Sequence, residues 1–361
     1  MEGTIVSSST EAAEKPHPSH RVIAYDMARG IGIILVVIGH ALPMDTYARA
    51  FVYSFHMPLF FIISGAVMKP EQLSGTFLQK VRAAIYAERK LIANYLFYSG
   101  FFIVYDVIVR YVYLHQIGKR DLVWDVYQTV TLYGINVLWF LITLASAKVI
   151  TALVFDQTKS DVQRIVIAVA MYLIAAFFGN IISVRLPAEG VLKLVYYPVA
   201  ALTEIATMTP FVILGHTARP YLPKILEHFK FLLPLLIIPN ILWCFSFGAV
   251  DYHLLRSCFP PLSLLLALTG SLAIFGIGLL LYRVPVIRPI LMWSSRHSLF
   301  IMVTHEYLLI VAFIVIPILN QFNISNHAIY LILQIALLMV VEVPLCQNFE
   351  PLANRFIERI K

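Results

Sequence analysis

The chain has 361 residues, of which 60% are hydrophobic and 13% charged, and its mean hydropathy is +0.81. Soluble domains average about 45–50% apolar and about 25% charged residues, so this composition excludes an ordinary soluble protein and predicts a polytopic membrane protein. The net charge of +7 is no sign of nucleic-acid binding, because the cytoplasmic loops of a membrane protein carry an excess of Lys and Arg.

Residues 1–20 are polar and small, with an SSST run followed by a His- and Pro-rich stretch. They lack the short apolar core and cleavage site of a signal peptide. We therefore expect a disordered cytoplasmic tail, followed by a transmembrane domain over residues 21–347.

Ten apolar stretches of about 20 residues, the length that crosses a bilayer, follow the tail. They predict an all-α protein with about ten transmembrane helices. No internal repeat is evident, which disfavours a transporter built from repeated halves. Asp106 and Arg110 interrupt the third stretch, and Pro198 and Pro210 predict that the sixth is kinked or broken. The stretches lie near residues 23–43, 51–68, 91–114, 136–155, 164–184, 196–215, 230–250, 260–282, 298–319 and 327–346.

The loops predict the orientation of the chain. With the N-terminus inside, eighteen Lys and Arg residues lie in inside segments and six in outside loops. This asymmetry and the even number of spans predict that both termini are cytoplasmic. Residues 348–361 are amphipathic and cationic, and we expect them to lie along the inner membrane surface.

The first span carries Asp26, Arg29 and His40, although ionisable side chains in a membrane usually face a protein interior or a cavity. Arg29 and His40 are eleven residues apart, so they share a helix face and are separated by about 16 Å along the axis. Asp26 and Arg29 are close enough to pair. The pair is either an anchor at the inner interface or a guanidinium that is oriented towards a polar cavity.

His56 lies in the second span, which a short loop joins to the first. The two helices are therefore expected to be antiparallel neighbours, with His56 and His40 at a similar depth. Pro58 frees the carbonyl of Ser54 and predicts a bend beside the two imidazoles. Each histidine is either a satisfied core residue or a base that takes a proton from a substrate near neutral pH. Two histidines are no specific metal signal, and no metal is expected.

A basic segment, KVRAAIYAERK, follows the second span. Arg82 and Arg89 share a helical face, and Lys90 adjoins them. The cluster either follows the positive-inside rule alone or binds the phosphates of a cytosolic ligand, since guanidinium groups match phosphate geometry.

Further polar and aromatic residues in the spans are candidates for substrate binding. They are Trp139 near one membrane face, Glu204 inside the sixth stretch, and His305 and Glu306 in the ninth. Lys148 and Glu342 are further charges within spans, with a structural role expected. Cys244 and Cys258 could pair across an outside loop, although isolated cysteines in apolar spans are usually small buried hydrophobes.

The sequence lacks the nucleotide-binding, zinc-protease, serine-hydrolase and CxxC signatures. Its motifs instead form a set that resembles the membrane-bound acyltransferase-3 family, nearest to the fucose 4-O-acetylase-like and exopolysaccharide acetyltransferase branch. The resemblance rests first on DMARGIGIILVVIGH, which fits the family's arginine-x10-histidine pattern, and on YSFHMPLFFIISG. It rests also on the basic segment, LWFLITL, FVILG and SSRHSLFIMVTH, which follow in the family's order.

This resemblance implies a multi-pass protein of a cell membrane, such as the bacterial inner membrane, that transfers an acetyl or other acyl group from cytosolic acyl-CoA to a sugar hydroxyl. The acceptor is expected to be a lipid-linked glycan or envelope polysaccharide, with polysaccharide biosynthesis proteins as partners. His40 becomes the catalytic histidine and Arg29 its motif partner. The basic segment lacks the family's usual pair of arginines three residues apart. The extra extracytoplasmic domain of many relatives is not expected here.

In the mechanism that this resemblance implies, CoA phosphates bind Arg82, Arg89 and Lys90. His40 acts as general base or is transiently acylated, Asp26 holds Arg29, and His56 orients His40 or stabilises the oxyanion. Two other classes of protein stay open. One is a transporter or flippase for a lipid-linked sugar or small solute that uses the intramembrane His and Glu. The other is a non-catalytic membrane partner of an acyltransferase.

Overall fold

The computed structural model of the protein describes residues 20–360 except 44–45, 70–72, 115–118, 187, 247–249, 258, 306–313, 323 and 325. The regular elements of this part of the chain are helices, accompanied by one isolated bridge between Asp251 and Arg256. The α-helices are α1 His20–Ala41, α2 Tyr47–Tyr53, α3 His56–Val67, α4 Phe77–Ala87, α5 Arg89–Leu114, α6 Lys119–Val130, α7 Trp139–Gln157, α8 Asp161–Arg185, α9 Lys193–Ala218, α10 Leu222–Glu227, α11 Phe229–Ser246, α12 Pro260–Leu281, α13 Ile287–Arg296, α14 Ser298–Thr304, α15 Ile316–Asn320 and α16 His327–Ile360.

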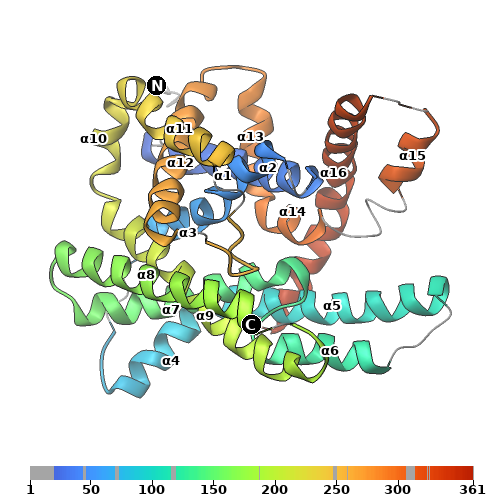
Figure 1. Cartoon of the computed structure of the whole chain (residues 1–361), viewed down its shortest axis with the longest axis horizontal. Helices are drawn as coiled ribbons and strands as arrows, with labels where there is room; N and C mark the ends of the chain where they lie inside the picture. The colour runs from blue at the N-terminus through green and yellow to red at the C-terminus, as the bar shows by residue number, and fades with distance from the viewer. Residues whose placement is uncertain are drawn as a thin grey trace, which may run out of the picture.

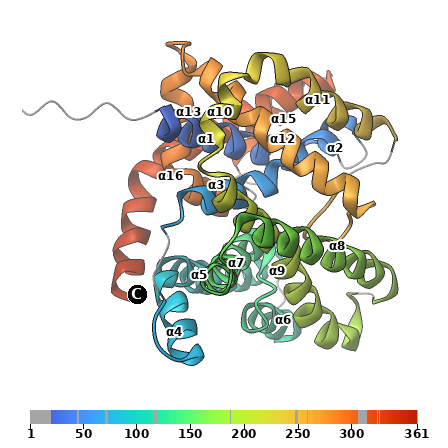
Figure 2. The ribbon, with the colours of Figure 1, turned by 90° about the vertical axis from the view of Figure 1, so that its left-hand side faces the viewer.

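The helices form two groups that pack on each other (Figures 1 and 2). Helices α4 to α9 lie together in one group, and α1 to α3 with α10 to α15 form the other. The interface is built mainly by α3, which packs along α9. Helix α16 contacts α1 and α14 of one group and α5 of the other.

Eight helical segments of the described chain are long and apolar enough to cross a membrane, which confirms an all-helical, multi-pass protein. Two of the ten expected spans are not among them. Helix α11 is apolar over a shorter length, Phe229–Trp243, and the ninth stretch is described only as α14 and α15 because residues 306–313 lie outside the described part.

Helix α1 lies inside the bundle, where it contacts α3, α12 and α13. Its buried side is made of small and apolar side chains, among them Ala24, Met27 and Ala28. The helix is uninterrupted from His20 to Ala41, so the spacing argument that places Arg29 and His40 on one face applies to it.

The second expected span is two helices, because the chain leaves the helix at Ser54 and Phe55 and re-enters it at His56. This interruption agrees with the bend predicted from Pro58. The break is connected to another part of the bundle, since Ser54 Oγ donates a 2.7 Å hydrogen bond to Oδ1 of Asn240 in α11. The break places His56 at the start of α3, where its Nδ1 lies 2.9 Å from the Val52 carbonyl.

Helix α9 continues through both of its prolines, so of the two predicted outcomes, a kink or a break, the break is excluded. Pro198 leaves the carbonyl of Leu194 without its helical partner. The hydroxyl of Tyr127 replaces that partner with a 2.7 Å hydrogen bond. A side chain of α6 therefore donates a hydrogen bond to the carbonyl that the proline leaves without a helical partner.

Two glycines allow α3 and α9 to touch through their backbones. A Cβ on Gly65 would lie 2.0 Å from the Val212 carbonyl oxygen, and one on Gly215 would lie 2.2 Å from that of Ile62. Such reciprocal contacts need small residues, as is usual where membrane helices pack closely.

Gly65→Ala and Gly215→Ala are therefore expected to destabilise the protein by about 1–3 kcal/mol, because the added methyl forces the two helices apart. Gly100→Ala in α5 is the matched control, since a Cβ there meets nothing within 4 Å. Thermal unfolding in detergent should place the control at or above the wild type. Equal melting temperatures for all three variants would contradict the close contact.

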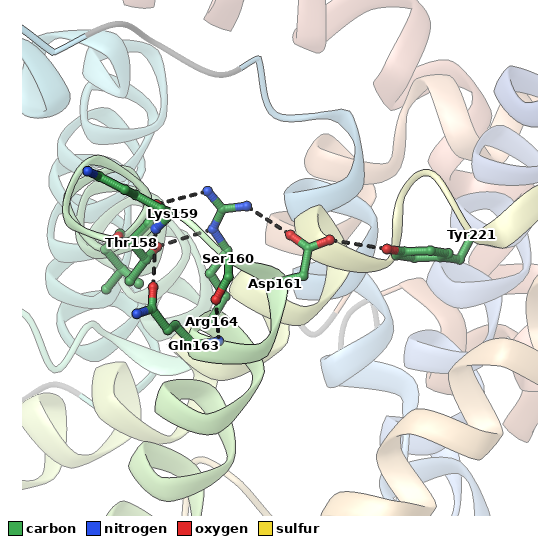
Figure 3. A network of polar contacts seen from close by, with 8 residues as sticks. Thr158, Lys159, Ser160, Asp161, Gln163, Arg164 and Tyr221 are labelled. Atoms are coloured by element: carbon green, nitrogen blue, oxygen red, sulfur yellow. Dashed lines mark hydrogen bonds and ion pairs between the residues drawn. The ribbon is translucent and has the colours of Figure 1, made fainter.

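A polar network closes the turn between α7 and α8 (Figure 3). The Arg164 guanidinium donates to Asp161 Oδ1 at 2.9 Å and to the Thr158 carbonyl at 3.1 Å. Tyr221, which follows α9, donates its hydroxyl to Asp161 Oδ2 at 3.2 Å. The network ties the ends of α7, α8 and α9 together at one end of the bundle.

Helix α16 runs without interruption from His327 to Ile360, so residues 348–360 continue the last helix. Within it, Glu342 is fully buried and accepts hydrogen bonds from the Thr304 hydroxyl at 2.9 and 3.0 Å. Cys346 is buried with a free thiol. Cys244 and Cys258, for which a pairing and two isolated buried thiols were the alternatives, lie outside the described side chains.

Candidate functional site

A cavity of about 500 Å³ opens beside Arg29. Arg29 lies 3.7 Å from Asp26, and the two side chains are 30% and 32% exposed. The ion pair predicted from their spacing is thus present, and its guanidinium also lines the cavity. Three more cations, Lys69, Lys148 and Arg296, line the same space together with apolar residues of α3, α7 and α14.

Lys148 is anchored in this wall by Glu88, whose carboxylate lies 2.6 Å from the ammonium group. Glu88 ends α4 and is nearly buried, with 8% of its side chain exposed. Lys148 and Glu342, both expected to have structural roles, thus have separate partners. The Lys148–Glu88 pair fixes the end of α4 against α7.

Lys148→Met is expected to cost about 3–5 kcal/mol of stability, because it leaves the Glu88 carboxylate buried without its partner. The double variant Lys148→Met/Glu88→Gln removes both charges and should recover most of that loss. Thermal unfolding of the two variants measures the difference. A double variant as unstable as the single one would show that the lost packing, and not the unpaired charge, sets the cost.

The three cations predicted to bind phosphate lie outside this cavity. Arg82 on α4, and Arg89 and Lys90 at the start of α5, are all exposed, and none of them lines the space beside Arg29. The Arg89 guanidinium donates to the Tyr86 carbonyl at 3.0 Å and lies 4.1 Å from the centroid of the Tyr86 ring.

A second cavity of about 200 Å³ lies at the other end of α1, beside His40. The rings of His40 and His305 meet edge to face with their centroids 5.0 Å apart. His305 is 1% exposed, and its Nδ1 lies 2.9 Å from the Ile301 carbonyl. The structure therefore brings together two of the predicted site residues, from α1 and from the end of α14. Glu306 lies outside the described residues.

His56 lines the same cavity, so the predicted approach of the first two spans is present. Tyr53 lies between the histidines, with its ring centroid 6.1 Å from that of His40 and 4.7 Å from that of His56. Arg49 joins the group: its Nη2 donates to the Tyr53 hydroxyl at 2.8 Å, and its guanidinium carbon lies 4.4 Å from the Tyr53 ring centroid. Sequence reasoning placed Arg49 only in an outer loop.

The facing wall carries a histidine that sequence reasoning missed. His253 lies in the short turn between α11 and α12, and its Nδ1 is 2.9 Å from Oε1 of the fully buried Glu204. Its ring stacks on Trp139 at 5.2 Å and on Tyr133 at 4.9 Å. Glu204 and Trp139, expected to contact substrate, therefore both hold His253. The signal in the sequence was the polar DYH stretch between two apolar spans.

The two cavities meet at Phe140 and Met302, which line both of them. Phe140 is held edge to face by Phe60 at 5.8 Å and by Phe61 at 5.4 Å. Met302 has an unbranched, flexible side chain, which adapts more readily than a ring held by two others. The two cavities thus share a wall made of one fixed and one adaptable side chain.

Within the described residues, one group of metal-ligand side chains converges elsewhere. His297, Cys346 and Glu350 have ligand atoms within 4.8 Å of one another. His297 Nδ1 and Glu350 Oε2 lie 2.5 Å apart, in hydrogen-bond contact. None of the three lines either cavity, and their contact joins the α13–α14 junction to α16.

The geometry can support group transfer across the length of α1. One cavity offers cations for an anionic ligand, and the other offers imidazoles for proton transfer. A carboxylate-held imidazole beside a second imidazole is an arrangement that suits acid–base and nucleophilic chemistry.

A comparison with protein-family models matches residues 22–346 to the acyltransferase domain of the acyltransferase-3 family. The match covers both cavities and every described helix that lines them. No curated protein and no solved structure matches the chain.

Proposed function

The chain belongs to the acyltransferase-3 family, and from this premise we propose that it moves an acyl group, normally acetyl, from cytosolic acyl-CoA to a sugar hydroxyl. The acceptor is a lipid-linked glycan unit or an envelope polysaccharide, as in the fucose 4-O-acetylase-like and exopolysaccharide branch that the sequence resembles. The proposal includes ten spans in a bacterial inner membrane, with both termini in the cytoplasm.

One observation supports this function most strongly. Arg29 lines a cavity rich in cations, His40 lines a cavity rich in histidines, and the two cavities share Phe140 and Met302. Arg29 and His40 are eleven positions apart, which corresponds to about 16 Å of helix, a length comparable to an extended pantetheine arm. A thioester entering past Arg29 would thus reach His40.

The donor is held by charge. The CoA phosphates bind at the mouth of the larger cavity, where Lys69 and Arg296 line the wall. Arg82, Arg89 and Lys90 lie on the neighbouring exposed face of α4 and α5 and add to the positive field. Arg29 is kept in place by Asp26, with which it pairs.

The reaction takes place beside His40. In direct transfer, a base removes the proton of the acceptor hydroxyl, its oxygen bonds to the acyl carbon, the carbon–sulfur bond breaks, and the thiolate leaves and is protonated. Alternatively, His40 first takes the acyl group and then passes it to the hydroxyl. The Arg49 guanidinium lies in the same cavity, where it can stabilise the developing oxyanion. His56 gives its Nδ1 proton to the Val52 carbonyl, so its neutral ring presents Nε2 as an acceptor that can orient His40 or the acceptor hydroxyl.

Acetyl-CoA should raise the melting temperature of the purified protein, and free CoA should appear when the glycan fraction of the native membrane is added. Thermal unfolding with and without acetyl-CoA, together with thiol detection, measures both effects. A transporter or flippase of a lipid-linked sugar would show neither. The absence of both responses would therefore overturn the proposed function.

A further inference from the structure

We propose that His253, held by Glu204, is the base that takes the proton from the acceptor hydroxyl. This inference rests on the proposed function and deepens it, because it assigns a second catalytic histidine on the wall opposite α1. His40 is then left to receive the acyl group or to act on the donor side of the same cavity.

Glu204 and His253 form a carboxylate–imidazole pair. Glu204 is 0% exposed, and its Oε1 lies 2.9 Å from Nδ1 of His253. With Glu204 ionised, Nδ1–H donates to the carboxylate and the neutral ring carries its lone pair on Nε2. A buried carboxylate in this position fixes the tautomer and stabilises the imidazolium that forms when a proton is taken up, as in hydrolase triads.

The imidazole of His253 is both held and accessible. Trp139 and Tyr133 stack on its ring at interplanar angles of 17° and 28°. The His253 side chain is nevertheless 26% exposed and lines the cavity that contains His40. Two aromatic neighbours set the plane of the ring, and its edge reaches the cavity. The ring is therefore oriented for proton transfer.

The turn that carries His253 is fixed by several hydrogen bonds. Asp251 and Arg256 exchange both backbone hydrogen bonds at 2.8 Å, and Asp251 Oδ1 accepts the Leu254 amide at 3.0 Å. The Ser257 amide donates to Asn180 Oδ1 of α8 at 2.9 Å. A connection with this many fixed contacts holds its side chains in place, and His253 is one of four consecutive residues of it, 251–254, that line the cavity.

The proton transfer balances within the proposed reaction. The acceptor O–H gives its proton to Nε2 of His253 while its oxygen bonds to the acyl carbon. The bond from that carbon to the thioester sulfur breaks, or the bond to the His40 nitrogen if His40 carries the acyl group. The proton then passes to the departing thiolate or to His40, and His253 is neutral again.

The first experiment measures transfer of labelled acetyl from acetyl-CoA to the glycan fraction extracted from the native membrane. His253→Ala should lower transfer by about 100-fold or more, within the range of general-base catalysis. Thermal stabilisation by acetyl-CoA should persist, because the cavity beside Arg29 is untouched. Imidazole added to the buffer should restore part of the transfer. His228→Ala, which removes an exposed histidine on the surface, is the matched control.

The second experiment uses Glu204→Gln and the pH dependence of the rate. Without the carboxylate the imidazolium releases its proton more readily, so the acidic limb of the profile should move to lower pH as the plateau falls. The titratable and charged groups around His253 also affect this profile. They are Glu204 on α9, Asp251 in the same turn, Tyr133 before α7, Arg49 on α2, His40 on α1 and His56 on α3.

The outcomes separate this inference from the proposed function. If His253→Ala transfers acetyl at nearly the normal rate, His253 is not the base, whereas the acyltransferase activity stands. Suppose that transfer is lost, that imidazole does not restore it, and that the acidic limb of the Glu204→Gln profile stays at the wild-type pH. The His253–Glu204 pair then has a structural role and the inference is wrong. If the wild type is neither stabilised by acetyl-CoA nor able to transfer, both proposals fail.

Discussion

Replacing His40 with Ala is expected to reduce acetyl transfer by about 10²–10⁴-fold or more, whether this ring transfers a proton on the donor side or carries the acyl group. The protein should stay folded, because His40 lies near the end of α1 and is only half-buried. Its ring contacts His305 and Tyr53, both of which keep their backbone or side-chain hydrogen bonds in the variant.

The measurement is transfer of labelled acetyl to native membrane glycans, with acetyl-CoA stabilisation as the folding and donor-binding control. His40→Ala should bind acetyl-CoA like the wild type, since the cations that meet the donor line the other cavity. His228→Ala serves again as the matched control. Near-normal turnover by His40→Ala would show that the chemistry takes place elsewhere.

The sequence predicts those parts of the fold that depend on local pattern. Hydropathy and length identify the helices, and the eleven-residue spacing alone places Arg29 and His40 on one face of α1. Proline chemistry predicts the break before α3. In α9 the same rule leaves a kink or a break open and cannot choose between them. It considers only the helix that contains the proline, whereas Tyr127 of α6 satisfies the carbonyl that Pro198 frees.

The candidate site is predicted only where its residues are close along the chain. Asp26 and Arg29 are three residues apart, and their pairing follows directly from helix geometry. Lys148 and Glu88 are 60 positions apart, and His253 and Glu204 are 49 apart, so no spacing rule connects them. Hydropathy also does not distinguish one polar residue within a span from another. Only packing separates Glu342, bonded to Thr304, from Glu204, bonded to an imidazole at a cavity.

In the proposed reaction, the side chains shared by the two cavities control which acyl groups can reach His40. Met302 is 3% exposed and lines both cavities, as does Phe140, which two other phenylalanines hold in place. On the proposed route, a thioester passes from the Arg29 cavity to His40 by displacing one of these two side chains. The flexible thioether of Met302 is the side chain that can yield, so its volume should decide which acyl groups reach His40.

Met302→Trp should therefore lower acetyl transfer by about 100-fold or more, comparable with removing a catalytic base, because the thioester no longer reaches the imidazole. Acetyl-CoA should still stabilise this variant, since the phosphates bind on the near side of the block. Met302→Leu conserves volume and should transfer normally. Met302→Ala widens the junction and should raise the ratio of butyryl to acetyl transfer, a ratio measured within one variant and thus independent of its stability. Unchanged chain-length preference in Met302→Ala, with full activity in Met302→Trp, would place the donor's path away from this junction.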